Sequence, residues 1–118
     1  MTTIEDLLSE AQEVLDRFWF VRSLVEIDRT DATVTLHLRI APELVVQAYL
    51  SEISGRLSFA LVDPSGRLYG WNRDRGLWHR HPYDDPGQHE PLPEAVSPRP
   101  LLQFMTRVEG ILLENELI

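Results

Sequence analysis

Strict two-residue alternation between Thr33 and Ile40 is the feature that most limits what this chain can fold into. Polar side chains alternate there with four apolar ones, Val34, Leu36, Leu38 and Ile40. Because successive side chains of a strand point to opposite faces, the pattern predicts a strand with one buried and one solvated face. Strands of this kind are typical of antiparallel sheets, which can face water on one side.

The segments before and after this strand predict further strands of the same sheet. Residues 19–28 predict the hairpin partner of the strand, with an inward face formed by Trp19, Val21, Val25 and Ile27. Residues 44–50 are apolar at successive positions, and we expect a strand that is covered on both faces. Two further strands, 57–61 and 67–71, are joined by the turn Asp63-Pro64-Ser65-Gly66. After a break at 72–76, residues 77–81 predict another extended segment.

Helical periodicity appears at both ends of the chain. Apolar residues recur every three or four positions over 4–18, where Thr2 and Glu5 fit a capping box. Residues 82–100 carry six prolines and predict a long loop. Ser97 and Pro98 then suit the start of a helix that ends near Leu117. We therefore expect one α+β domain over 1–118, with five or six strands in an antiparallel meander and both helices on one face of the sheet.

Composition excludes several classes of function. The absence of cysteine rules out disulfides, thiolate catalysis and zinc bound by sulfur, and the formal net charge of -8 argues against a general phosphate-binding surface. All eleven basic residues are arginine, and five of them fall between 56 and 81, so a local basic surface is possible. The first residues lack the pattern of a signal peptide, and we expect a cytoplasmic protein.

Histidines gather in one stretch. Three of the four lie within eleven residues, at His79, His81 and His89. On a strand over 77–81, His79 and His81 share one face while Trp78 and Arg80 take the other, and His89 can fold back beside the pair. Histidine suits proton transfer near neutral pH, so one ring can act as general base and another as general acid.

These residues predict a site for RNA cleavage without a cofactor. We expect His79 and His81 to move protons, and Arg80 to stabilise the charge that develops on the phosphate. The candidate RNA-binding residues are Arg73, Arg75, Trp71, Tyr83 and His89, since arginine binds phosphate and aromatic rings stack on unpaired bases.

Two other interpretations of the histidines stay open. The spacing His79-x-His81, with His89, Asp84 or Asp85 as a further ligand, could bind zinc or another transition metal. The same residues could equally be polar surface on an edge strand and a loop, and Trp71 could pack in the core. The acidic faces of both helices could be solvated surface or could bind a basic partner.

The central part of the chain resembles the TumE-like toxin family. The residues that carry the resemblance are the turn Asp63-Pro-Ser-Gly66-Arg67, the aromatic-polar pair Trp71-Asn72, and His79, His81 and His89 beside prolines. The family's adjacent histidine pair is interrupted here by Arg80. The resemblance implies a toxin of a two-gene toxin–antitoxin module, neutralised by a cognate antitoxin protein, with RNA as the plausible target.

Two expectations about partners complete the interpretation. An exposed edge strand at 77–81 could pair across a homodimer. The alternative to a toxin is a non-enzymatic interaction module, in which acidic helical faces bind a basic protein and the proline-rich loop becomes ordered on contact.

Overall fold

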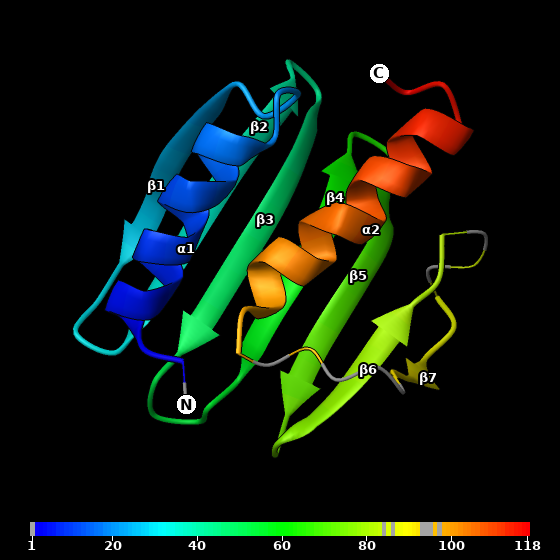
Figure 1. Cartoon of the computed structure of the whole chain (residues 1–118). Coiled ribbons are helices and arrows are strands. Elements are labelled where there is room, and N and C mark those ends of the chain that lie inside the picture. The colour runs from blue at the N-terminus through cyan, green and yellow to red at the C-terminus, as the bar shows by residue number, and fades with distance from the viewer. Residues whose placement is uncertain (1, 84, 86, 93–95, 97) are drawn as a thin grey trace.

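The chain runs from one helix through an antiparallel sheet to a second helix (Figure 1). The computed structural model describes residues 2–83, 85, 87–92, 96 and 98–118. The helices are α1 (Ile4–Arg17) and α2 (Pro100–Glu114). The strands are β1 (Ser23–Arg29), β2 (Thr33–Ala41), β3 (Leu44–Ser51), β4 (Leu57–Asp63), β5 (Gly66–Asp74), β6 (Leu77–His81) and β7 (Glu90–Pro91).

The described strands form one sheet in sequence order, and each strand is antiparallel to the next. This confirms the predicted meander and the α+β class, with seven strands in place of the expected five or six. The additional strand is β7, a two-residue segment inside the stretch predicted as a loop. The sequence had suggested that β6 is an exposed edge strand. Because β7 pairs with His79 and Arg80, β6 is not the outermost strand.

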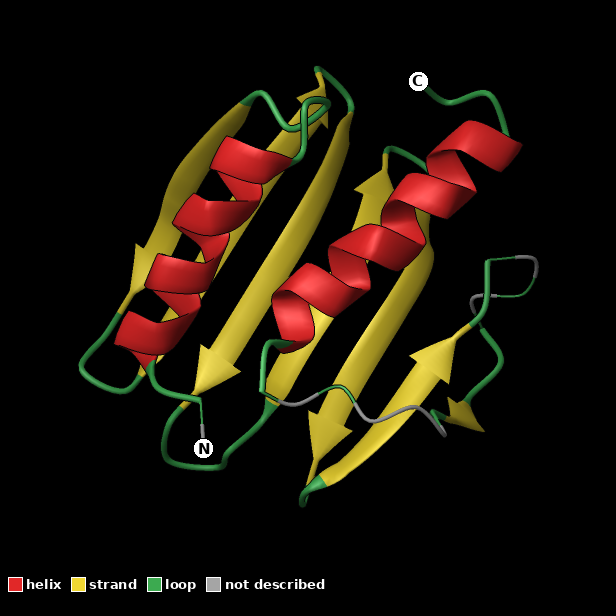
Figure 2. Ribbon diagram, in the orientation of Figure 1, coloured by secondary structure: helices red, strands yellow, loops and turns green. Residues whose placement is uncertain are grey.

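Both helices lie on one face of the sheet, as expected (Figure 2). α1 covers β1 and β2, and α2 covers β4 and β5 (Figure 1). The opposite face carries no helix among the described residues, and we call it the open face. The fold therefore has two layers, with the core between the helices and one side of the sheet.

The core follows from alternation in the strands and periodicity in the helices. The four apolar side chains that alternate along β2 are all buried, as predicted, and so are Leu57, Phe59 and Leu61 of β4. α2 inserts Phe104 among aromatic rings of the sheet. The ring centroid of Phe104 lies 5.4 Å from that of Phe59, 5.7 Å from that of Tyr69 and 5.3 Å from that of Trp71.

α1 begins at Ile4, as predicted, whereas its capping box and the bounds of α2 differ from the prediction. The capping box of α1 is formed by Thr3 and Asp6, one residue after the predicted pair. α2 begins at Pro100 and ends at Glu114, so the predicted start at Pro98 and end near Leu117 are wrong. The predicted cap, Ser97, lies outside the described residues.

For the first strand, the sequence assigned the wrong residues to the buried face. Trp19 lies in a turn before β1 and is 72% exposed, and Val25 and Ile27 are also exposed. Val21 is buried, as predicted, but it precedes the strand. The chain turns at residues 19 and 20, and the strand begins only at Ser23, where Ser23 and Val25 pair with the open-face residues Arg39 and His37. Alternation counted from Trp19 therefore does not carry into the strand.

Two further strands differ from prediction. β3 is covered on one face only, since Gln47 is exposed on the open face and hydrogen-bonds to His37 across the ladder. β5 continues to Asp74 through part of the predicted break. Arg75 and Gly76 then make the turn, both with positive φ (54° and 78°) as a two-residue type I′ hairpin requires.

Candidate functional site

β6 places His79 and His81 together on the open face. In the ladder with β5, His79 pairs with Asn72 and His81 with Gly70, whereas Arg80 pairs with the buried Trp71. Directly paired residues of antiparallel strands point to the same face. The two histidines therefore share the open face and Arg80 points to the helix side, which confirms the alternation predicted for this segment.

His89 folds back onto this pair. Its ring centroid lies 4.4 Å from that of His79, in a stacked arrangement, and 4.9 Å from that of His81. The return of the chain explains the contact, because Glu90 pairs with Arg80 and Pro91 with His79 just after this residue. We call His79, His81 and His89 the histidine cluster. Within it, His89 is exposed, His79 is half-buried, and His81 is buried with 8% of its surface exposed.

A line of hydrogen bonds across three strands orients His81. The hydroxyl of Ser58 donates to Oδ1 of Asn72 at 2.7 Å, and Nδ2 of Asn72 lies 3.0 Å from Nε2 of His81. With the amide in this orientation, Nε2 accepts the bond and the neutral ring carries its proton on Nδ1. Ser58 and Asn72 were not among the residues predicted for the site. Ser58 occupies the outward position between two apolar residues of β4, and its pairing with Asn72 could have been inferred only from the register.

Arg67 pairs with Val62 on the open face and so lies on the same face as the cluster. Gly70 separates the helix-side residues Tyr69 and Trp71, so a side chain at Gly70 would point to the open face. A Cβ placed there would lie 3.1 Å from Cδ of Arg67. The side chain of Arg67 therefore crosses the open face above Gly70, the residue that pairs with His81.

Arg80 and Tyr83 lie on the other side of the sheet. Two nitrogens of the Arg80 guanidinium, Nε and Nη2, donate to Oε1 of Glu90. Arg80, Glu90 and Tyr83 line a cavity of about 490 Å³ that Arg107 and Gly110 of α2 also line. The sheet thus stands between Arg80 and the histidines with which the sequence had grouped it.

The remaining predicted RNA-binding residues are spread over the helix side and the β5–β6 turn. Trp71 is 2% exposed, lies against Phe104, and donates its indole N–H to the Tyr69 hydroxyl at 2.8 Å. This is the packing role that the sequence also allowed. Arg73 points to the helix side, and Arg75 is exposed at the turn.

Metal ligation has no support in the described part of the chain. Among those residues, no group of three or more histidine, cysteine, aspartate or glutamate side chains is arranged to hold a metal ion. Asp85 is exposed, and Asp84, the other carboxylate considered as a ligand, lies outside the described residues.

Comparisons with protein families, with curated proteins and with solved structures find no match to this chain. Within the described residues, neither helix has the length and apolar character needed to cross a membrane.

Proposed function

We propose that this protein is a toxin-like ribonuclease that cleaves RNA by acid–base catalysis at the histidine cluster. The observation that carries the proposal is the meeting of three imidazole rings from two separate segments on an uncovered sheet face. Histidine is the side chain most often used for general acid–base catalysis, because it exchanges protons near neutral pH.

The reaction that such a cluster suits is transfer of the RNA phosphodiester to its own 2′ oxygen. A neutral imidazole takes the proton from the 2′-hydroxyl as the 2′ oxygen bonds to phosphorus. An imidazolium gives a proton to the 5′ oxygen as its bond to phosphorus breaks. The products are a 2′,3′-cyclic phosphate and a free 5′-hydroxyl, and the proton count is unchanged overall.

Exposure decides which histidines exchange these protons. His79 and His89 reach solvent, and we assign proton transfer to them. His81 is buried and hydrogen-bonded to Asn72, so we assign it a positioning role beneath the stacked pair. Arg67 takes the place that the sequence gave to Arg80, because it lies on the same face as the cluster.

The toxin part of the proposal is supported by the resemblance of residues 63–89 to the TumE-like family, with a cognate antitoxin protein as the expected partner. The strongly acidic balance of the chain disfavours wide contact with RNA. A short substrate segment over the cluster needs only local positive charge, which Arg67 supplies.

Exposed apolar residues favour a second candidate function, a module that binds another protein. Trp19 stands beside an apolar groove that also contains Pro42, Leu117 and Ile118. Large exposed aromatic and aliphatic side chains are typical of protein interfaces. The exposed acidic residues of α1 would select a basic partner.

Bacterial growth under tightly induced expression separates the two candidates. We expect the wild type to arrest growth and the double variant His79→Ala/His89→Ala to permit it, with protein levels matched by blotting. His37→Ala is the matched control, because His37 lies on the open face away from the cluster, and this variant should still arrest growth. Equal arrest by the wild type and the double variant would contradict the assigned site. Growth with all three would favour the binding module.

A further inference from the structure

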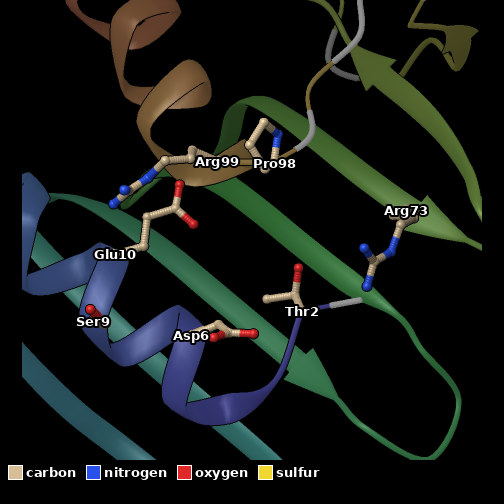
Figure 3. Close-up of a pocket in the computed structure, with 7 residues that line it drawn as sticks. All are labelled: Thr2, Asp6, Ser9, Glu10, Arg73, Pro98 and Arg99. Carbon is tan, nitrogen blue, oxygen red and sulfur yellow. The ribbon is translucent and has the colours of Figure 1, made fainter.

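A second polar cavity lies on the helix side of the sheet, where the first turns of α1 and α2 approach the end of β5 (Figure 3). It has a volume of about 480 Å³. Its polar walls are formed by Thr2, Asp6, Ser9, Glu10, Arg73 and Arg99. It includes none of the histidines, and the proposed ribonuclease site makes no use of it.

Arg73 is the charged residue of this cavity that bonds only to a backbone carbonyl among the described residues. Nε and Nη2 both donate to the carbonyl oxygen of Gly55, at 3.2 and 3.1 Å, and the guanidinium lies 5.8 Å from the ring centroid of Trp78. No carboxylate forms an ion pair with Arg73 among the described residues. The side chain is half-buried, and this burial lowers the pKa of the guanidinium.

The carboxylates of the cavity are already engaged by backbone amides. Oδ2 of Asp6 accepts the N–H of Thr3 at 3.1 Å, and Oε2 of Glu10 accepts the N–H of Leu102 at 2.8 Å. Both groups therefore face the helix ends that they cap. They are not bonded to Arg73, which still has unused N–H donors.

Thr2 adds a hydroxyl and Arg99 a positive charge to this cavity, whereas the carboxylates of Asp6 and Glu10 add negative charge. Figure 3 shows Thr2 and Arg73 on one side of the cavity and Arg99 on the opposite side. Glu13 is shared by Arg17 and Arg99, so these three side chains together carry one positive charge. A partly desolvated arginine with free donors and a nearby hydroxyl is suited to a phosphate group, whose oxygens accept several hydrogen bonds at once.

We propose that this cavity binds a phosphate group, with Arg73 and Thr2 as the contacting residues and Arg99 contributing positive potential. The site goes beyond the proposed ribonuclease function and does not depend on it. The phosphate can belong to the end of an RNA chain or to a small phosphorylated compound, and binding measurements distinguish these sources.

The test is a titration of the isotope-labelled protein with inorganic phosphate, followed by the NMR signals of the Arg73 Nε–H and the Thr2 amide. We expect saturable shifts of both signals. Arg73→Gln should weaken binding roughly tenfold to a hundredfold, because it removes charge-assisted hydrogen bonds. Arg39→Gln removes the same charge from an exposed position on β2 and should leave binding unchanged.

The Arg73 side chain also joins β5 to the turn between β3 and β4, so Arg73→Gln can disturb the fold. A second variant therefore leaves Arg73 in place. Ser9→Glu keeps a good helix former on α1 and places a negative charge at the cavity wall, so it should weaken phosphate binding to a similar degree. Absence of saturable shifts in the wild type, or shifts that persist in Ser9→Glu, would overturn the proposal.

The source of the phosphate is found with two short RNAs that differ only in a 5′-phosphate or 5′-hydroxyl end. Both are titrated into His79→Ala/His89→Ala, so that cleavage does not interfere. If the phosphorylated RNA binds more tightly than inorganic phosphate, the site is assigned to RNA ends. If the phosphorylated RNA and inorganic phosphate bind equally, the site is assigned to small phosphorylated compounds. No shift at Arg73 with either RNA, together with saturable shifts from inorganic phosphate, also assigns the site to small phosphorylated compounds, whatever activity the histidines have.

Discussion

Gly70 shows how one absent side chain shapes the candidate site. It pairs with His81 and faces the open side, where a Cβ atom would lie 3.0 Å from the carbonyl oxygen of Phe59 and 3.1 Å from Cδ of Arg67. The backbone oxygen belongs to the sheet ladder and cannot move away easily. The bare backbone of Gly70 therefore lets the arginine lie close to the histidines.

Gly70→Ala tests this packing. We expect a loss of about 1–3 kcal/mol in the free energy of unfolding, since the added methyl group crowds Phe59 and displaces Arg67. Urea denaturation measures the loss. Gly110→Ala is the control, because a Cβ there meets no atom within 4 Å and alanine favours a helix. Equal free energies of unfolding for Gly70→Ala and the wild type would show that the close packing at Gly70 does not affect stability.

Local pattern predicted part of the site at this scale. Alternation along 77–81 was enough to place His79 and His81 on one face, and proximity in sequence suggested the return of His89. The pattern could not place Arg67, Asn72 or Ser58 beside them. Their positions depend on the register of β4 and β5, which short-range periodicity does not determine.

At the scale of elements, α1 caps α2. The N-cap residue of α2, Arg99, makes no capping hydrogen bond with its side chain. The carboxylate of Glu10 instead accepts the N–H group of Leu102. A negative charge at the positive end of a helix is favourable. Burial nevertheless raises the pKa of Glu10, and the bonds to Leu102 and Leu101 and the charge of Arg99 oppose that rise only in part.

The raised pKa of Glu10 predicts the sign of a pH effect. The folded protein holds this proton more tightly than the unfolded chain, so the resulting stability is present below the unfolded pKa and is lost as pH rises through the folded pKa. From about pH 4 to about pH 7, the free energy of unfolding of the wild type should therefore fall relative to that of Glu10→Gln. Urea denaturation at several pH values measures the difference.

Glu13 provides a control of opposite sign. Its hydrogen bond from Arg17, and then that from Arg99, lowers the pKa of Glu13. Its contribution is present above the unfolded pKa and is lost as pH falls through the folded pKa. Relative to Glu13→Gln, the wild type should thus gain stability over the same rise in pH. The same slope in both comparisons would contradict the assignment of Glu10.

The elements that were predicted well are those in which the apolar pattern of the element itself determines which side chains are buried. β2, β4 and α1 each bury an uninterrupted stripe and were found as expected. β1 was placed in the wrong phase because the chain turns at residues 19 and 20 before the strand begins, so alternation counted from Trp19 does not carry into it. The start of α2 was missed because its cap comes from Glu10, a residue of the other helix at the far end of the chain, and no local signal marks it.

At the scale of the whole molecule, the two layers separate two sets of polar groups. The helix side holds the core and the cavity proposed to bind phosphate, whereas the open face holds the histidine cluster and Arg67. The formal net charge of the whole chain is -8, so both sites lie on an acidic protein. Their separation by the sheet means that loss of one site should leave the other in place.

Cleavage of RNA by the purified protein tests the central claim most directly. A labelled single-stranded RNA is incubated with the wild type, His79→Ala, His89→Ala and His37→Ala in the presence of EDTA, and the new ends are identified. We predict 2′,3′-cyclic phosphate and 5′-hydroxyl ends with the wild type and His37→Ala. Removal of His79 or His89 should slow cleavage by roughly a hundredfold to ten-thousandfold, the usual contribution of a general acid or base. Absence of cleavage by the folded wild type, or equal rates in all four proteins, would contradict the account.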